Sequence, residues 1–346
     1  MEDLIQQLCQ QNPGVSEAKV RAYVLAQMQG QMSREYPASF RSLLDGGAAA
    51  DASAEAEAEL QVRCHCKRCV FKVQVATAGG ESTSNIRCHC QCCRRFHSSA
   101  FATFVSVQSG LEDWGLGDNA MLYKDTCAAL GPVQRVVCAK CKTKLATIPL
   151  EDNAKHVRAV LALGAVEDDS IPKALARRWQ TEFQEWELES GAKWWAATPS
   201  SCQGRRFQES LGGCACGDCR FKAAIFPGEA QHCYCNLCRR MSGAAAQTWI
   251  PSSTEGFQWT KQDSLRLVRT TGHGQRHMCT RCGTVLTIVY DSQPDCVWPV
   301  AGVLDDESLP EDLTNSWYRV IHICCSMMQP WYRLPDDDLP RLKYAG

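Results

Sequence analysis

The sequence contains two arrays in which three cysteines are spaced as C-x-C-x-x-C and are followed by two arginines. The arrays are Cys88-His89-Cys90-Gln91-Cys92-Cys93-Arg94-Arg95 and Cys233-Tyr234-Cys235-Asn236-Leu237-Cys238-Arg239-Arg240. Three thiolates from one short turn can hold a metal ion and leave the fourth tetrahedral position empty, as catalytic zinc sites do. We therefore expect a fold that positions this metal-binding loop twice, once for each array.

Each array stands between a C-x-C pair and a C-x-x-C pair, so the whole cysteine pattern occurs twice. The outer pairs are Cys64, Cys66, Cys138 and Cys141 in the first copy and Cys214, Cys216, Cys279 and Cys282 in the second. Residues 164–172 also resemble residues 302–310. Such repetition indicates an internal duplication, that is, two tandem domains of one fold.

The composition narrows the class of protein. The chain has 346 residues and 23 cysteines, and its N-terminus lacks the basic and apolar regions of a signal peptide. Clustered cysteines without a secretion signal favour metal ligands over disulfides, in the cytosol or nucleus. The net charge of −1 lacks the excess of basic residues that is typical of proteins that bind nucleic acid or an anionic membrane surface.

The remaining pattern predicts a mainly β protein. Short alternating runs bounded by turn residues predict small antiparallel sheets, two in each domain. The predicted strands include 70–75, 102–107, 221–226, 246–250, 265–269, 285–290 and 297–303. The one helix expected within the copies covers the stretch from Lys173 to Glu189.

We divide the chain into five segments. Residues 1–44 carry apolar stripes typical of amphipathic helices, which we interpret as an accessory hairpin rather than a partner-binding arm. An Ala/Glu-rich linker follows. The expected boundaries are 1–44 helical segment, 45–61 linker, 62–190 first zinc domain, 191–211 connection and 212–346 second zinc domain.

In each copy the two outer pairs can form a closed site of four thiolates, whereas the middle three form an open site. Three other cysteines lie inside the clusters as competing ligands, and we prefer Cys93 over Cys92 because it directly precedes the two arginines. The competitors are Cys69, Cys92 and Cys219. We expect the remaining cysteines to be small core residues or free thiols; they are Cys9, Cys127, Cys202, Cys296, Cys324 and Cys325.

The second copy resembles the glutathione-dependent formaldehyde-activating enzyme family, which also contains centromere protein V. The resemblance lies in 213–217, 233–240, 242–243, 279–284, 302–306 and 322–323. It implies two tandem β-tent domains with two Zn²⁺ each, up to four per chain. It also implies structural zinc on Cys214, Cys216, Cys279 and Cys282, and a second, catalytic zinc on Cys233, Cys235 and Cys238.

The first copy resembles the family less closely. The implied sites are Cys64, Cys66, Cys138 and Cys141 for the structural zinc, and Cys88, Cys90 and Cys93 for the open one. Lys67, Ser98 and Lys142 stand where the second copy has Gly217, Gly243 and Gly283. If φ is positive there, each costs about 1 kcal/mol or more. We therefore expect activity in the second copy.

The function implied by the resemblance is a zinc-dependent carbon–sulfur lyase or synthase that joins formaldehyde to glutathione, giving S-hydroxymethylglutathione. We interpret the catalytic zinc as holding the thiolate of glutathione. Arg239 and Arg240 either bind the carboxylates of glutathione or form a solvated pair that balances the thiolates. His273, His277 and His322 are candidate proton carriers or structural hydrogen-bonding groups.

Two other functions compete with this prediction. The first is a non-catalytic, zinc-stabilised binding module like centromere protein V, which the acidic linker disfavours because such a module would carry a basic tail. The second is a zinc-ribbon nucleic-acid binder, which the neutral charge argues against. We expect small-molecule thiol and aldehyde partners, and neither nucleic acid nor membrane.

Overall fold

The computed structural model describes residues 57–77, 85–152, 157–187, 208–225, 230–308, 321–335 and 339–344. The predicted helical segment 1–44 lies outside these residues. Strand β1 begins at Glu57, within the segment predicted as a linker, and β10 begins at Gln208, within the predicted connection. Among the described residues, no helix has the length and apolar character needed to cross a membrane.

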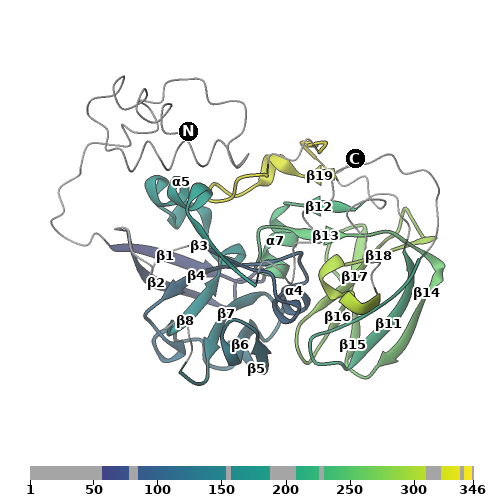
Figure 1. Ribbon diagram of the computed structural model, residues 1–346, viewed down its shortest axis with the longest axis horizontal. Helices are drawn as coiled ribbons and strands as arrows, with labels where there is room; N and C mark the ends of the chain where they lie inside the picture. Colours follow the sequence, from purple (N-terminus) through teal and green to yellow (C-terminus); the bar gives the residue numbers. More distant parts are fainter. Residues whose placement is uncertain are drawn as a thin grey trace, which may run out of the picture. The chain divides into compact units, whose positions relative to one another are not determined.

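The first repeat consists mainly of short strands, as its alternating pattern predicts (Figure 1). In β2, for example, Phe71, Val73 and Val75 are buried and the residues between them are exposed. The strands are β1 (Glu57–Arg63), β2 (Val70–Ala76), β3 (Asn85–Cys88), β4 (Ala102–Val107), β5 (Ala120–Cys127), β6 (Gly131–Cys138), β7 (Lys144–Pro149), β8 (Ala159–Ala162) and β9 (Phe183–Trp186), and the helices are α4 (Gln91–His97) and α5 (Lys173–Thr181).

These strands form a two-stranded sheet, β1-β2, and a seven-stranded sheet in the order β5-β6-β7-β8-β4-β3-β9. All pairs are antiparallel except β3 with β9. The helix predicted from Lys173 to Glu189 is confirmed in its first part, as α5, and wrong beyond it. It ends at Thr181, and the following residues join the sheet as β9 because they pair with β3.

The second repeat also consists mainly of short strands, but these are divided differently between its two sheets. Its strands are β10 (Gln208–Gly213), β11 (Cys219–Ile225), β12 (Gln231–Cys233), β13 (Gln247–Trp249), β14 (Ser252–Gln262), β15 (Leu265–Arg269), β16 (Gly274–Cys279), β17 (Val285–Tyr290), β18 (Cys296–Pro299) and β19 (Ile321–Ile323), and its helix is α7 (Asn236–Ser242). One sheet has the order β10-β11-β14-β18-β17-β16-β15 and the other β13-β12-β19. The strand predicted to reach Val303 ends at Pro299 and gives way to a 3-10 helix, Ala301–Val303.

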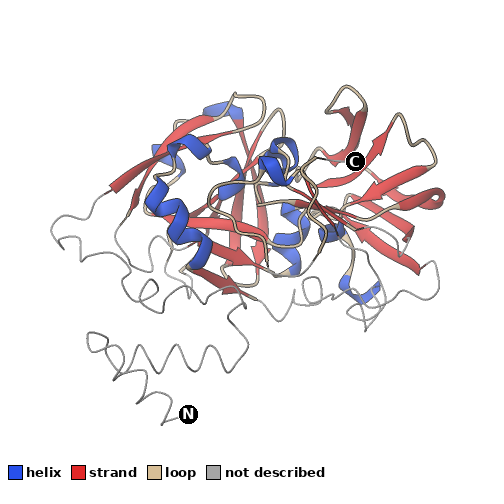
Figure 2. Ribbon diagram, turned by 90° about the horizontal axis from the view of Figure 1, so that it is seen from above, coloured by secondary structure: helices blue, strands red, loops and turns tan. Residues whose placement is uncertain are grey.

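The predicted mainly β class with small antiparallel sheets is confirmed, and helices form a minor part of the described chain (Figure 2). The two repeats pack together within one compact unit, Ala56–Gly346. Trp331 and Tyr332, which follow the last strand of the second repeat, are buried in the same apolar cluster as Leu60 and Val73 of the first. Residues of the second repeat therefore help to complete the hydrophobic core of the first.

The three turns where glycine is replaced in the first repeat do have positive φ. The angles are 63° at Lys67, 52° at Ser98 and 60° at Lys142, against 79°, 68° and 76° at the matching glycines of the second repeat. Side chains with a Cβ rarely adopt this left-handed conformation. The first repeat thus keeps the backbone of the second at the cost of local strain.

Candidate metal centres and the cavity of the second repeat

The outer cysteine pairs come together in each repeat as the spacing predicts. The sulfur atoms lie within 4.8 Å of one another in two groups, Cys64, Cys66, Cys138 and Cys141, and Cys214, Cys216, Cys279 and Cys282. Each C-x-C turn follows the first strand of its repeat, and each C-x-x-C turn joins two neighbouring strands of the seven-stranded sheet. Four converging thiols match a structural zinc site.

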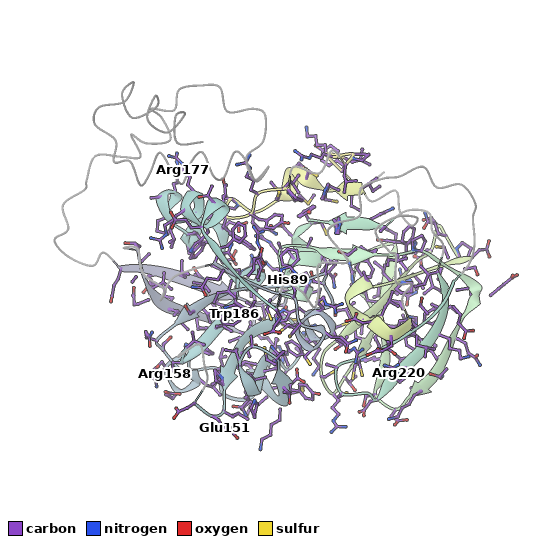
Figure 3. All side chains as sticks on the ribbon, in the orientation of Figure 1. His89, Glu151, Arg158, Arg177, Trp186 and Arg220 are labelled. Carbon is purple, nitrogen blue, oxygen red and sulfur yellow. The ribbon has the colours of Figure 1, made fainter. Side chains whose placement is uncertain are left out.

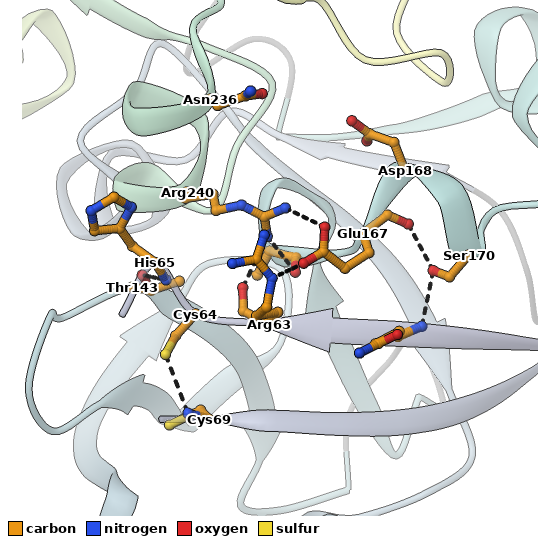
Figure 4. Close-up of polar contacts among 12 residues, drawn as sticks. Arg63, Cys64, His65, Cys69, Thr143, Glu167, Asp168, Ser170, Asn236 and Arg240 are labelled. Carbon is orange, nitrogen blue, oxygen red and sulfur yellow. Dashed lines mark hydrogen bonds and ion pairs between the residues drawn. The ribbon is translucent and has the colours of Figure 1, made fainter. Parts of the chain in front are cut away.

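The turns direct backbone N–H groups at sulfur, as expected for metal-binding knuckles. The amide of Cys69 donates to Cys64 Sγ at 3.2 Å (Figure 4), and that of Cys219 donates to Cys214 Sγ at 3.3 Å. These donors favour the thiolate form and orient the sulfur. The side chains of Cys69 and Cys219 themselves fall outside the two groups of four.

The middle cysteines of the second repeat also converge. Cys233 ends β12, Cys235 caps α7, and Cys238 lies in the first turn of that helix, with the three sulfurs within 4.8 Å. The amide of Cys238 donates to Cys235 Sγ at 3.4 Å. Hydrogen bonds from Cys233 and Cys238 lower the pKa of the Cys235 thiol. Contact with Cys235 in turn raises the pKa of the Cys233 thiol, so within this array negative charge is favoured at Cys235.

A cavity of about 660 Å³ opens onto these three thiols. Its volume falls within the range of roughly 300–1,000 Å³ found for small-molecule sites. Its lining includes Leu237, Trp249, Thr271, His273, Arg276, Ile288, Tyr290, Trp298 and Cys324 as well as the three cysteines. Apolar walls with a few polar groups are typical of a ligand site.

Arg276 lines this cavity and brings a positive charge to it. Its guanidinium is buried, donates to Cys238 Sγ at 3.4 Å and lies 5.5 Å from the ring of Trp249. Tyr290 lies at the end of β17, and burial raises the pKa of its phenol to about 12. The cavity thus offers a fixed positive charge beside the thiols and a phenol that stays protonated at neutral pH.

Cys324 is a buried thiol of the same cavity that the sequence pattern did not single out. It follows β19, whose residue Ile323 pairs with Cys233. Hydrogen bonding with Cys324 contributes to lowering the pKa of Cys235. In the sequence, its position directly after His322-Ile323, one of the motifs that resemble the family, is the one local feature that points to a role at this site.

The middle site of the first repeat differs from its prediction. Cys88, Cys90 and Cys93 converge, and a fourth thiol joins them: Cys127, which we expected to be a core residue or a free thiol. Cys127 Sγ lies 3.6 Å from Cys93 Sγ, and all four residues are buried. A fourth thiol thus lies beside the three cysteines for which we expected an open site. The preference for Cys93 over Cys92 agrees with the grouping.

The arginine pairs after the arrays reach across to the other repeat. Arg239 Nη1 donates to Asp168 Oδ1 at 2.5 Å, and Arg240 Nη2 donates to Glu167 Oε2 at 2.6 Å (Figure 4). Arg94 and Arg95 make the reciprocal bonds, at 2.5 Å to Asp306 Oδ2 and at 2.7 Å to Asp305 Oδ1. These bonds between the repeats do not follow from the local sequence around the arginines.

All four of these ion pairs therefore join the repeats, and three of the arginine side chains are at most 7% exposed. The role predicted for Arg239 and Arg240, binding the carboxylates of glutathione, stays a prediction. It would require their bonds to the first repeat to open.

The three candidate histidines lie in different surroundings. His273 lines the cavity and stacks on Tyr290 with ring centroids 6.0 Å apart. His322 Nδ1 lies 2.9 Å from the hydroxyl of buried Tyr234, and His277 Nδ1 lies 2.7 Å from Thr287 Oγ1. The latter two thus have structural hydrogen bonds, and His273 is the one placed to face a ligand.

The first repeat has a different polar pair where the second has Tyr234 and His322. His89 stands next to Trp186, whose carbonyl accepts from its amide at 2.9 Å (Figure 3), and its ring Nε2 lies 2.7 Å from Glu185 Oε2. The strand registers place Glu185 opposite Arg87 and His322 opposite His232. The two middle sites therefore differ beyond their cysteines.

The donor sets fit a soft or borderline metal ion. All four groups consist of cysteine thiols alone, and such sets select zinc, copper(I) or iron–sulfur clusters over magnesium or calcium. In three groups four thiols can complete a tetrahedron, whereas the group of the second-repeat cavity has three. The cysteine groups are thus able to hold metal ions.

Comparisons with known proteins show similar sequences. A protein of Halomonas elongata named "Putative glutathione-dependent formaldehyde-activating enzyme" is 28% identical over 142 residues, which are 39% of this chain and 86% of that protein. A crystal structure of a Rhodobacter sphaeroides protein aligns with 31% of this chain and 96% of its own at 19% identity, with a TM-score of 0.26, too low to bear on fold or function.

The description of one family matches most of both repeats. It covers residues 59–182 and 209–322, which include all four cysteine groups. The match spans more than half of the chain. This chain therefore belongs to the glutathione-dependent formaldehyde-activating enzyme family, with two copies of the family's domain in tandem.

Proposed function

We propose that the second repeat joins formaldehyde to glutathione, as a zinc-dependent carbon–sulfur lyase or synthase, to give S-hydroxymethylglutathione. The observation that carries the proposal is a cavity of small-molecule size that opens onto the three thiols of Cys233, Cys235 and Cys238. Family membership and the name of the Halomonas relative support this choice of reactants.

The reaction forms one carbon–sulfur bond. The sulfur of glutathione attacks the carbonyl carbon, the carbonyl π electrons move to oxygen, and that oxygen takes up a proton. A zinc ion held by the three cysteines would keep the attacking sulfur in its thiolate form. The proposal thus assigns the nucleophile to the substrate and its activation to the site.

The residues of the cavity can position the reactants. Arg276 places a buried positive charge beside Cys238, where it can attract a glutathione carboxylate and offset the charge of the thiolates. Trp249 and Trp298 give the cavity apolar walls. We assign delivery of the proton to His273, the imidazole that lines the cavity.

The test is NMR exchange between free glutathione and its formaldehyde adduct, with and without the zinc-loaded chain at matched thiol concentration. The wild type and Cys296→Ser, a change outside the cavity, should accelerate exchange, and Cys235→Ser should abolish the acceleration. An unchanged exchange rate with the wild type would favour a binding module. Retained acceleration in Cys235→Ser, with loss in Cys90→Ser, would move the site to the first repeat.

A further inference from the structure

We infer that Cys127 is the fourth ligand of a closed metal site with Cys88, Cys90 and Cys93, so that the middle centre of the first repeat binds metal without taking a substrate. The four sulfurs lie within 4.8 Å of one another, as they do in the two outer groups. Four thiolates saturate tetrahedral zinc. The inference concerns the first repeat and does not depend on the proposed function.

Cys127 reaches the site because one hairpin is longer than its counterpart. Strands β5 and β15 both start opposite the first cysteine of the C-x-x-C turn that follows them, since Ala120 pairs with Cys138 and Leu265 pairs with Cys279. β5 then runs for eight residues and β15 for five. The three added residues place Cys127 at the last pair of the hairpin, opposite Gly131.

The tip of this hairpin is packed against the centre. Ala129 and Leu130, which connect β5 to β6, are buried in the same apolar cluster as Cys88, Cys90 and Cys93. Hydrogen bonding from Cys127 is the leading cause that lowers the pKa of the Cys90 thiol. In the second repeat, residues of the corresponding turn, Thr271 and His273, line the cavity.

The arginines beside the two middle centres differ in the same way: that of the first repeat is enclosed, and that of the second repeat lines the cavity. Arg135 donates to Cys93 Sγ at 3.5 Å and to Asp125 Oδ2 at 3.1 Å, and its side chain is fully buried. Arg276, at the matching place, donates to Cys238 Sγ and to Thr270 Oγ1 and faces the cavity. The charge of Arg135 is therefore balanced within the protein, and that of Arg276 is turned toward a ligand.

Cadmium NMR of the full chain tests the inference, because the chemical shift of cadmium reports the number of sulfur ligands. We expect the wild type to show three resonances of four-sulfur sites, one for each group of four thiols. Cys127→Ser should move one of them to the three-sulfur region. Cys92→Ser changes a neighbouring thiol outside the group and should leave all of them in place.

A shift caused by Cys92→Ser, or a spectrum that Cys127→Ser leaves unchanged, would overturn the inference. If Cys127→Ser does not fold, Cys127→His replaces it, because histidine can supply a fourth ligand. One resonance should then move to a position between the three-sulfur and four-sulfur regions. An unchanged four-sulfur resonance in Cys127→His would equally contradict a role for Cys127 as ligand.

Discussion

Arg239 of the second repeat donates from Nη1 to Oδ1 of Asp168 in the first repeat at 2.5 Å, and Arg94 of the first repeat makes the matching bond to Asp306 of the second. Each arginine follows the third cysteine of its array directly. The helix that carries two thiols of one metal centre is thus tied to the opposite repeat. The position of each centre depends on the packing of both domains.

This packing is close enough to exclude side chains. A Cβ at Gly164 would lie 2.5 Å from the carbonyl carbon of Gly243, and one at Gly302 would lie 2.2 Å from the carbonyl oxygen of Ser99. Gly164 and Gly302 occupy the same position in the two similar segments, residues 164–172 and 302–310. Glycine is required there because the backbones of the two repeats approach each other directly.

Removing one partner of the cross-repeat ion pair should destabilise the protein. Asp168→Asn leaves the guanidinium of Arg239, which is 3% exposed, without its carboxylate, and we expect a loss of about 1–3 kcal/mol in the free energy of unfolding. Denaturant unfolding of the zinc-loaded chain measures it. Asp169→Asn, one exposed position further on, is the matched control and should change the free energy by less than about 0.5 kcal/mol.

Relieving the left-handed strain at Lys67 should stabilise the first repeat. Lys67 is exposed and has a φ of 63°, so Lys67→Gly should raise the free energy of unfolding by about 1 kcal/mol. Its exposed neighbour Arg68 is not among the positive-φ residues, so Arg68→Gly should give no gain. Equal effects in the two variants would show that Lys67 is not strained.

The charge of Arg276 should matter for thiol binding. On the proposed function, Arg276→Gln should weaken glutathione binding to the zinc-loaded chain about 10- to 100-fold, the equivalent of one charged hydrogen bond. Calorimetric titration measures this, and the zinc content of the same sample shows whether the metal is retained. Arg269→Gln removes an exposed arginine that pairs with Asp291 on the adjoining hairpin and should leave the affinity unchanged.

Acid should weaken the contact between the repeats through His97. Burial and the nearby charge of Arg135 hold the pKa of His97 well below its ordinary value of 6.5, and its Nδ1–H donates to the carbonyl of Ser242 at 2.8 Å. Below pH 6.5 the unfolded chain therefore takes up a proton that the folded chain does not. This contribution to stability is present above pH 6.5 and is lost as the pH falls.

The unfolding free energy, measured from pH 7 to pH 5, should fall more steeply for the wild type than for His97→Asn. The difference in slope should approach about 1.4 kcal/mol per pH unit. Protonation of the cysteine ligands affects both proteins alike and cancels in the comparison. Parallel curves would mean that His97 titrates normally in the folded protein.

The repeated cysteine pattern was enough to predict the outer groups of thiols and the converging middle arrays. In C-x-C and C-x-x-C turns the chain is too short to separate the thiols, so local spacing alone brings Cys233, Cys235 and Cys238 together. The strain at Lys67, Ser98 and Lys142 was also predictable, because comparison with the glycines of the second copy marks the turns that require positive φ.

Only the tertiary structure decided which distant residues contact the two middle sites and the arginines that follow them. Cys127 meets Cys93 across 34 residues, and Arg239 meets Asp168 across 71, and neither contact leaves a trace in local periodicity. The pairing of β5 with β6 brings Cys127 into place, and the packing of the two repeats directs the arginines. The duplicated sequence determined two similar metal-binding frames. The sheet pairing that places the longer strand β5, with Cys127 at its end, beside the middle centre of the first repeat made the two centres different.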